Sequence, residues 1–175
     1  MVFNYNCHYV FHYPIEKVMR TVLSLNIQQE EMLGLAIQKI EEMKDLDCIQ
    51  TEAARKNFVP DLLRETEDLK VPEIKYETEF WVDKANRSFW IRSRNLTWSD
   101  TAHIWQTSTF TAVDDWTNLD QEVAIGFDSL GRSGQRIENA LCSSFCNIFL
   151  AYINEIQQKM HEDETTNRLE GLKLE

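Results

Sequence analysis

The sequence predicts an α+β fold in which helices cover one face of an antiparallel sheet. A succession of segments before residue 128 alternates apolar and polar residues, as strands do, whereas residues 135–161 have the spacing of one long amphipathic helix. Strands followed by a terminal helix bury their apolar faces in this way. The 175 residues fit a single domain, residues 1–161, and a charged tail, residues 162–175, that we predict to be disordered.

The first elements are a strand and a short helix. Residues 3–12 are rich in Tyr, Val and Phe with a rough alternation, which is typical of a strand. Pro14 fits the first turn of a helix, because its missing N–H has no partner to lose there. Ile15, Val18 and Val22 then follow helical spacing, which predicts a helix to about residue 25 and a polar connector over residues 26–31.

A hairpin is the preferred interpretation of the next two segments, residues 32–42 and 48–57, with its turn at residues 44–47. The helical alternative stays open for both. In the first segment Ala36, Ile37, Ile40 and Met43 also match helical spacing, and the second has weak β propensity.

The clearest strands are residues 74–82 and 88–96, joined by a polar turn at residues 83–86. Residues 102–113 and 121–127 form a further pair, separated by a turn that we place at residues 114–118. Residues 131–134, Gly-Arg-Ser-Gly, break the pattern before the long helix. Its apolar stripe is wide enough to cover a sheet face: Ile137, Leu141, Phe145, Ile148, Phe149, Tyr152, Ile153 and Ile156.

Charge and composition exclude several classes of function. The net charge of −11 argues against non-specific nucleic-acid binding, which requires a basic surface, and against constitutive adhesion to anionic membranes. The first residues lack the basic start and continuous apolar run of a secretory signal, and no segment has the roughly 18 apolar residues of a membrane span. The four cysteines are scattered, so we expect free thiols.

Signatures of catalysis are missing from the sequence, so we expect a protein that is not an enzyme and that carries no cofactor. Residues 131–134 do not form a nucleophile elbow, and no phosphate-binding loop or dinucleotide fingerprint occurs. Cys142 and Cys146 lie one helical turn apart and could share a metal. The neighbouring Leu141 and Phe145 favour a packed core face instead, and we expect no metal site.

Two features indicate binding. The segment before the clearest strands, residues 58–71, is richer in apolar residues than a solvated connector requires, which suggests a lid over a cavity; these residues are Phe58, Val59, Pro60, Leu62, Leu63, Leu69 and Val71. Basic side chains flank it: Arg55 and Lys56 precede it, and Arg92 and Arg94 alternate in a later strand. They form either a solvated basic edge or a site for a phosphate group, for which the planar guanidinium is suited.

A family resemblance rests on four blocks of residues. They are Tyr-Val-Phe-His-Tyr-Pro-Ile-Glu-Lys-Val at 9–18, Asn-Phe-Val-Pro-Asp-Leu-Leu-Arg at 57–64, Leu-Lys-Val-Pro-Glu-Ile at 69–74 and Ile-Arg-Ser-Arg-Asn-Leu-Thr-Trp at 91–98. With these blocks the chain resembles the PRELI-domain lipid-transfer proteins over most of its length, residues 10–156. The resemblance implies a curved antiparallel sheet of about seven strands, closed by the long C-terminal helix around a lipid-sized cavity, with residues 58–71 as the lid.

The resemblance also implies a function: carrying single phospholipids, phosphatidic acid or phosphatidylserine, from the outer to the inner mitochondrial membrane. It places the protein in the intermembrane space, with the cytoplasm as the alternative, and implies transient membrane contact and a small twin Cys-x9-Cys helical partner. Arg55 would hold the lipid phosphate, supported by Lys56 or Arg94. Asn147 and Tyr152 would lie at the cavity mouth on the C-terminal helix.

Departures from the family pattern leave a second hypothesis open. Leu25 stands where the family has a basic head-group contact, and no Lys or Arg occurs between Arg136 and Lys159. The alternative is therefore a degenerate family member that acts as a protein-interaction module without lipid transfer.

Overall fold

The computed structural model describes residues 2–31, 36–42, 46–56, 70–100, 102–127 and 131–172. Within these ranges the chain forms seven strands and two helices, in the order β1, α1, β2 to β7, α2. The strands make one antiparallel sheet with the order β1-β7-β6-β5-β4-β3-β2. This confirms the predicted α+β class, the strand number and the long C-terminal helix.

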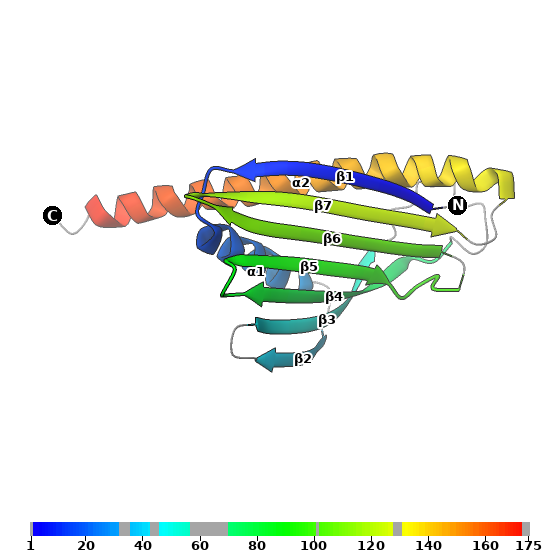
Figure 1. Ribbon diagram of the computed structural model, residues 1–175, viewed down its shortest axis with the longest axis horizontal. Helices are drawn as coiled ribbons and strands as arrows, with labels where there is room; N and C mark the ends of the chain where they lie inside the picture. The colour runs from blue at the N-terminus through cyan, green and yellow to red at the C-terminus, as the bar shows by residue number, and fades with distance from the viewer. Residues whose placement is uncertain are drawn as a thin grey trace.

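The strands lie close to the ranges that alternation predicts (Figure 1). Their bounds are β1 Val2–Phe11, β2 Ala36–Glu42, β3 Leu46–Lys56, β4 Glu73–Asp83, β5 Ser88–Asn95, β6 Ala102–Val113 and β7 Trp116–Phe127. The hairpin interpretation of β2 and β3 is correct, because Ile40 pairs with Ile49 in an antiparallel ladder that excludes the helical alternative. β1 pairs with β7, so the first and the last strand of the chain are neighbours in the sheet.

The predicted turn between β6 and β7 is wrong in extent. Only Asp114 and Asp115 form the turn, and Trp116 already pairs with Val113. The polarity of Thr117 suggested a loop, but this residue is fully buried and its hydroxyl donates a hydrogen bond of 2.8 Å to the Tyr13 carbonyl oxygen. A satisfied hydroxyl is as acceptable inside a sheet as in a turn.

Both helices are longer than the sequence pattern predicts. α1 spans Ile15–Glu31, so residues 26–31 are helical and not a connector. Asn26 is buried there. Its polar side chain is tolerated because the amide donates a hydrogen bond of 2.8 Å to the Val22 carbonyl oxygen, one turn earlier. α2 spans Gly131–Leu172 and includes both the Gly-Arg-Ser-Gly segment and residues 162–172, where we predicted a disordered tail. The Glu, Arg and Leu residues of that segment are good helix formers.

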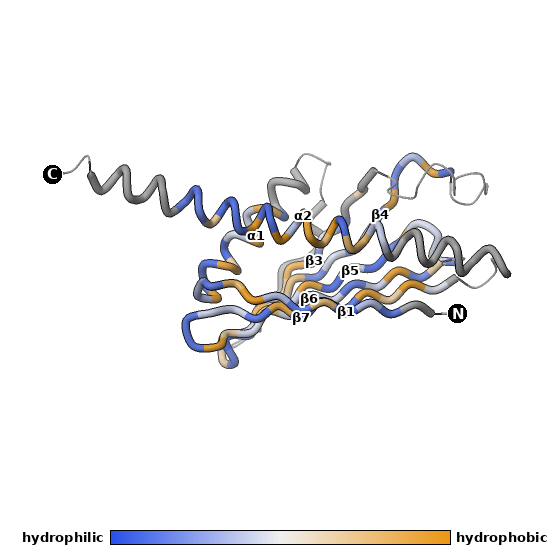
Figure 2. Tube along the Cα trace, turned by 90° about the horizontal axis from the view of Figure 1, so that it is seen from above, coloured by the Kyte–Doolittle hydropathy of each residue, from blue (hydrophilic) through white to orange (hydrophobic). Residues whose placement is uncertain are grey.

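The two helices lie on the same side of the curved sheet, and α2 runs across it (Figure 2). One apolar core joins the sheet to both helices at the α1 end. Phe89 and Phe110 stack there with ring centroids 4.1 Å apart, against Val18 of α1 and Ile153 of α2. Each of these side chains is nearly inaccessible to solvent, so their burial supplies much of the energy that holds helices to sheet.

Residues 58–69 lie outside the described residues, so the lid remains a prediction; of its proposed members only Val71 is described, and it is half-buried. No helix in the described part of the chain is both long and apolar enough to cross a membrane.

Candidate ligand-binding site

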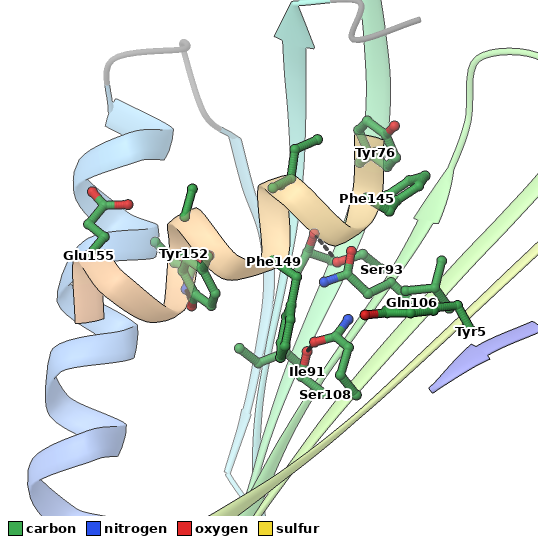
Figure 3. A pocket seen from close by; sticks show the side chains of 16 residues that line it. Tyr5, Tyr76, Ile91, Ser93, Gln106, Ser108, Phe145, Phe149, Tyr152 and Glu155 are labelled. Carbon is green, nitrogen blue, oxygen red and sulfur yellow. Dashed lines mark hydrogen bonds between the residues drawn. The ribbon is translucent and has the colours of Figure 1, made fainter. Parts of the chain in front are cut away.

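A cavity of about 360 Å³ lies between the sheet and α2 (Figure 3). This volume is in the usual range for small-molecule sites, roughly 300–1,000 Å³. Its floor comes from β4, β5, β6 and β7 with Tyr5 of β1, its roof from residues 145–155 of α2, and Asn26 of α1 adds to one wall. Two members of the apolar core, Ile91 and Phe149, also line this space.

The floor of the cavity is polar. We call the five side chains Thr78, Ser93, Gln106, Ser108 and Gln121 the polar band. Strand register places them in two adjacent rows, because Thr78 is opposite Ser93, Ser93 opposite Gln106, and Ser108 opposite Gln121.

The next row towards α1 is entirely different in character. It contains Phe89, Phe110 and Leu119, which pair across β5, β6 and β7 and pack in the core. Successive rows on the same face of one sheet therefore change from apolar to polar within a distance of about 7 Å, two residues along a strand. The change coincides with the border between the packed core and the cavity.

Hydrogen bonds satisfy only part of the polar band. The hydroxyl oxygens of Thr78 and Ser93 are 3.0 Å apart, and the Ser108 hydroxyl donates to the Gln121 side-chain oxygen at 2.6 Å. The Gln121 side-chain nitrogen makes no hydrogen bond to any described residue, although Gln121 is only 3% exposed. The same holds for the half-buried side-chain amide of Gln106. Two carboxamides thus offer hydrogen-bonding groups to the cavity.

The roof is apolar. Phe145 and Phe149 point from α2 towards the floor, and Ile148 and Ala151 complete this side (Figure 3). Ile91 and Val123 add apolar surface from the sheet. The cavity therefore has a largely apolar roof above a floor that combines the polar band with apolar side chains. Such a space suits an amphipathic molecule.

A contact between the two helices closes one end of the site. The Asn26 amide nitrogen donates a hydrogen bond of 2.9 Å to the phenol oxygen of Tyr152, in addition to its bond to Val22. Both N–H groups of the amide are thereby used. The only ionisable carboxylate among the described lining residues, Glu155, lies one turn further along α2 and is exposed.

At the β1 side, Tyr5 joins two thiols. Its phenol oxygen is 2.6 Å from Cys7 Sγ, and hydrogen bonding to Cys146 and to Cys7, with a contribution from burial, raises the pKa of the Tyr5 phenol. The phenol therefore stays neutral. Cys146 is a free, half-buried thiol, and within the described residues no three His, Cys, Asp or Glu side chains gather as metal ligands.

The structure places one of the residues that we assigned to the lipid head group away from the cavity. Arg94 does not line the cavity: it alternates with Ser93, lies on the outer face, forms an ion pair with Glu77, and its guanidinium lies 6.0 Å from the Trp105 ring centre. This corrects its assignment. Arg55 and Lys56 end β3, where their backbones pair with Ile74 and Glu73. Their side chains are not among those described, so their role stays a prediction.

The two residues proposed for the cavity mouth behave differently. Tyr152 lines the cavity. Asn147 is exposed and is not among the lining residues. Sequence reasoning missed Gln106, Ser108 and Gln121. Their signal was present: each is a polar residue at an inward position of a strand that has apolar residues at most of its other inward positions.

No model of a known protein family matches the chain. Solved structures do resemble it. The Zhui aromatase/cyclase from Streptomyces sp. R1128 matches with a TM-score of 0.57 and 12% identity, covering 92% of this chain and 94% of that chain. A START superfamily protein from Mycobacterium smegmatis matches with a TM-score of 0.52 and 11% identity, over 89% and 97% of the two chains.

The 18 kDa protein CC1736 from Caulobacter crescentus also matches, with a TM-score of 0.52, 15% identity and coverage of 89% and 97%. The chain has a START-like fold. At these identities the likeness establishes the fold, a curved sheet closed by a C-terminal helix, and the PRELI resemblance remains an interpretation of the sequence.

Proposed function

We propose that this chain is a non-enzymatic carrier that binds an amphipathic lipid in the cavity and moves it between membranes. The observation that carries the proposal is the pairing of an apolar roof, centred on Phe145 and Phe149, with the polar band below it. A START-like fold and the PRELI resemblance support the same interpretation. Each methylene that leaves water for the roof contributes about 0.8 kcal/mol to binding.

Local chemistry supports carriage over catalysis. Among the described lining residues the serines are Ser93 and Ser108, and their hydroxyls bond to Thr78 and Gln121. Threonine and glutamine are uncharged and do not remove a proton from a serine, so neither hydroxyl is activated as a nucleophile in this arrangement. Moving a lipid requires no bond to be made or broken.

The PRELI resemblance supports an extension of this proposal: the cargo is a phospholipid such as phosphatidic acid, carried between the mitochondrial membranes in the intermembrane space. In this extension Arg55, with Lys56, holds the phosphate and residues 58–71 open at the membrane surface. An open lid would make the transient membrane contact that the resemblance implies.

A transfer assay between labelled donor and acceptor vesicles tests carriage, together with mass spectrometry of lipid extracted from the purified protein. We expect co-purified lipid and protein-dependent transfer. Leu62→Asp combined with Leu63→Asp should slow transfer by impairing the lid, and Arg55→Glu should slow the transfer of phosphatidic acid. Arg20→Glu makes the same charge reversal at an exposed position of α1 and serves as control. The absence of both bound lipid and transfer would remove the proposal; unchanged transfer in Arg55→Glu would remove only the phosphate assignment.

Exposed apolar side chains favour one second candidate, a protein-interaction module. Leu150 and Ile148 of α2 are 57% and 44% exposed, and Trp105 is 53% exposed on the outer face of the sheet. A small helical partner of the twin Cys-x9-Cys type could cover such a surface on α2. Affinity capture of a purified partner of this type tests the candidate. Leu150→Glu should abolish capture, whereas Val113→Glu, the same kind of change at an exposed position of β6, should leave it unchanged.

A further inference from the structure

We propose that the polar band selects an uncharged head group: the cargo is a neutral amphiphile, such as an acylglycerol, that presents hydroxyl or carbonyl oxygens to the band. This inference rests on the proposed carrier function and names its ligand class. It competes with the phosphate-binding extension, because it assigns the head group to the floor of the cavity and not to Arg55.

Energetics indicate that the polar band is a binding feature and not a packing feature. A buried amide or hydroxyl group left without a partner costs roughly 1–3 kcal/mol. The adjacent row on the same sheet face has no such cost, because its apolar side chains Phe89, Phe110 and Leu119 lie in a packed core. Gln121 is as buried as that core, at 3% exposure, and its side-chain nitrogen has no protein partner among the described residues. This nitrogen is reached from the cavity that Gln121 lines, so a ligand that accepts a hydrogen bond can bind it there.

The donor and acceptor pattern matches hydroxyl and carbonyl groups. The side-chain nitrogens of Gln106 and Gln121 donate, and the Gln106 side-chain oxygen accepts. The paired hydroxyls of Thr78 and Ser93, 3.0 Å apart, leave lone pairs and one proton available. A glycerol hydroxyl both donates and accepts, and an ester carbonyl oxygen accepts, so a monoacylglycerol can satisfy the donors and the acceptors of the band.

Charge argues against an ionised head group at this position. None of the described lining residues is Lys, Arg or His, and the one charged member is Glu155. A phosphate moved from water onto the band would lose its hydration without gaining a cation, which is strongly unfavourable. The two arginines that flank Ser93 in sequence, Arg92 and Arg94, are at exposed positions of β5. Arg94 is paired with Glu77 outside the cavity.

The experiment compares head groups on one oleoyl chain. Monooleoylglycerol and oleoyl lysophosphatidate are delivered from cyclodextrin to the full chain, and binding is measured by isothermal titration calorimetry. We expect the uncharged lipid to bind at least tenfold more tightly than the anionic one. Equal or tighter binding of lysophosphatidate overturns this inference but leaves the carrier function standing. Binding of neither lipid overturns both.

Substitutions in the band then test the residues. Gln106→Leu together with Gln121→Leu should weaken monooleoylglycerol binding by about thirtyfold, since two hydrogen bonds of about 1 kcal/mol each are lost. Thr107→Val removes a polar group from the neighbouring position on the outer face and should change nothing. Gln106→Arg supplies the missing cation and should reduce the preference for the uncharged lipid at least tenfold. Unaltered affinity in the double variant, or an unaltered preference in Gln106→Arg, contradicts the assignment.

Discussion

The side-chain nitrogen of Asn26 in α1 donates a hydrogen bond of 2.9 Å to the phenol oxygen of Tyr152 in α2. These two residues lie where the apolar core meets the cavity. Asn26 lines the cavity and also donates to the carbonyl oxygen of Val22, which is buried in the core. The contact fixes the position of α2 over the sheet at the end of the site. It therefore links the stability of the fold to the shape of the cavity.

Replacing Asn26 by leucine should lower the free energy of unfolding by about 1–3 kcal/mol, because the bonds to Val22 and Tyr152 are lost together in a buried place. Tyr152→Phe removes only one of them and should cost about 1 kcal/mol. Urea unfolding at neutral pH measures both. Asn154→Leu, at an exposed position of α2, is the matched control and should be close to neutral. A stable Asn26→Leu variant would show that this contact does not hold the helices.

Enlarging a floor side chain should block the cavity without unfolding the protein. Val123 is buried on β7 and lines the cavity, so Val123→Phe directs extra atoms into empty space and not into the packed core. We expect lipid binding in the calorimetric assay to fall at least tenfold and thermal stability to change little. Val113→Phe, at an exposed position of β6, controls for the added hydrophobicity. If Val123→Phe binds as wild type does, the ligand lies elsewhere.

The β6–β7 turn stores backbone strain at one residue. Asp114 has a φ of 54°, whereas its neighbour Asp115 does not have a positive φ. Glycine adopts positive φ without the penalty of a side chain, about 1 kcal/mol or more. Both glycine substitutions cost the same unfolded-state entropy, so Asp114→Gly should exceed Asp115→Gly in unfolding free energy by about 1 kcal/mol. Urea unfolding gives this difference directly, and equal stabilities would contradict it.

Acid should weaken the contact between α1 and the β4–β5 turn. The Glu16 backbone N–H and then Arg87, which bonds to the carboxylate at 3.0 Å, lower the pKa of Glu16 below its ordinary 4.5. The folded pKa is below the unfolded one, so this stabilisation is present above pH 4.5 and is lost as the pH falls through the folded value.

Urea midpoints at pH 6 and pH 3 in low salt measure this dependence. Arg87→Gln should show a smaller loss of stability on acidification than wild type does. The effect should be modest and should shrink in high salt, because the pair is exposed. Arg20→Gln, on the exposed face of α1, should respond to acid as wild type does. An unchanged pH dependence in Arg87→Gln would exclude this pair as its source.

Alternation and helical spacing were sufficient to predict the fold class and most strands. The inward positions of β4 and β5, from Ile74 to Ser93, fall on one face as predicted. Boundaries were less accurate wherever a polar side chain is satisfied inside the fold, as with Asn26 and Thr117. Their hydrogen-bond partners come from distant or preceding elements, and a local pattern does not contain them.

The polar band illustrates why the site was harder to predict than the fold. It depends on register, and register depends on the turn between β6 and β7. A turn over residues 114–118 would place Gln121 beside Thr111. The observed two-residue turn places it beside Ser108. An error of three residues in the predicted length of one loop therefore removes the polar band from the prediction. The predicted strands themselves hardly change. The assignment of Arg94 failed for a different reason: alternation along β5, which the sequence already shows, places its side chain on the face opposite to that of Ser93.

The pairing of β1 with β7 also determines the order in which the molecule can form. Val2 is opposite Gly126, so the longest-range ladder of the sheet joins segments that more than a hundred residues separate. Such contacts close large loops before they gain any energy, which makes folding slow. Until β7 exists, Phe11 and Tyr9 have no strand beside them, and nascent chains expose this aromatic segment. We therefore expect the wall of the cavity that holds Tyr5 to be among the last parts of the protein to form.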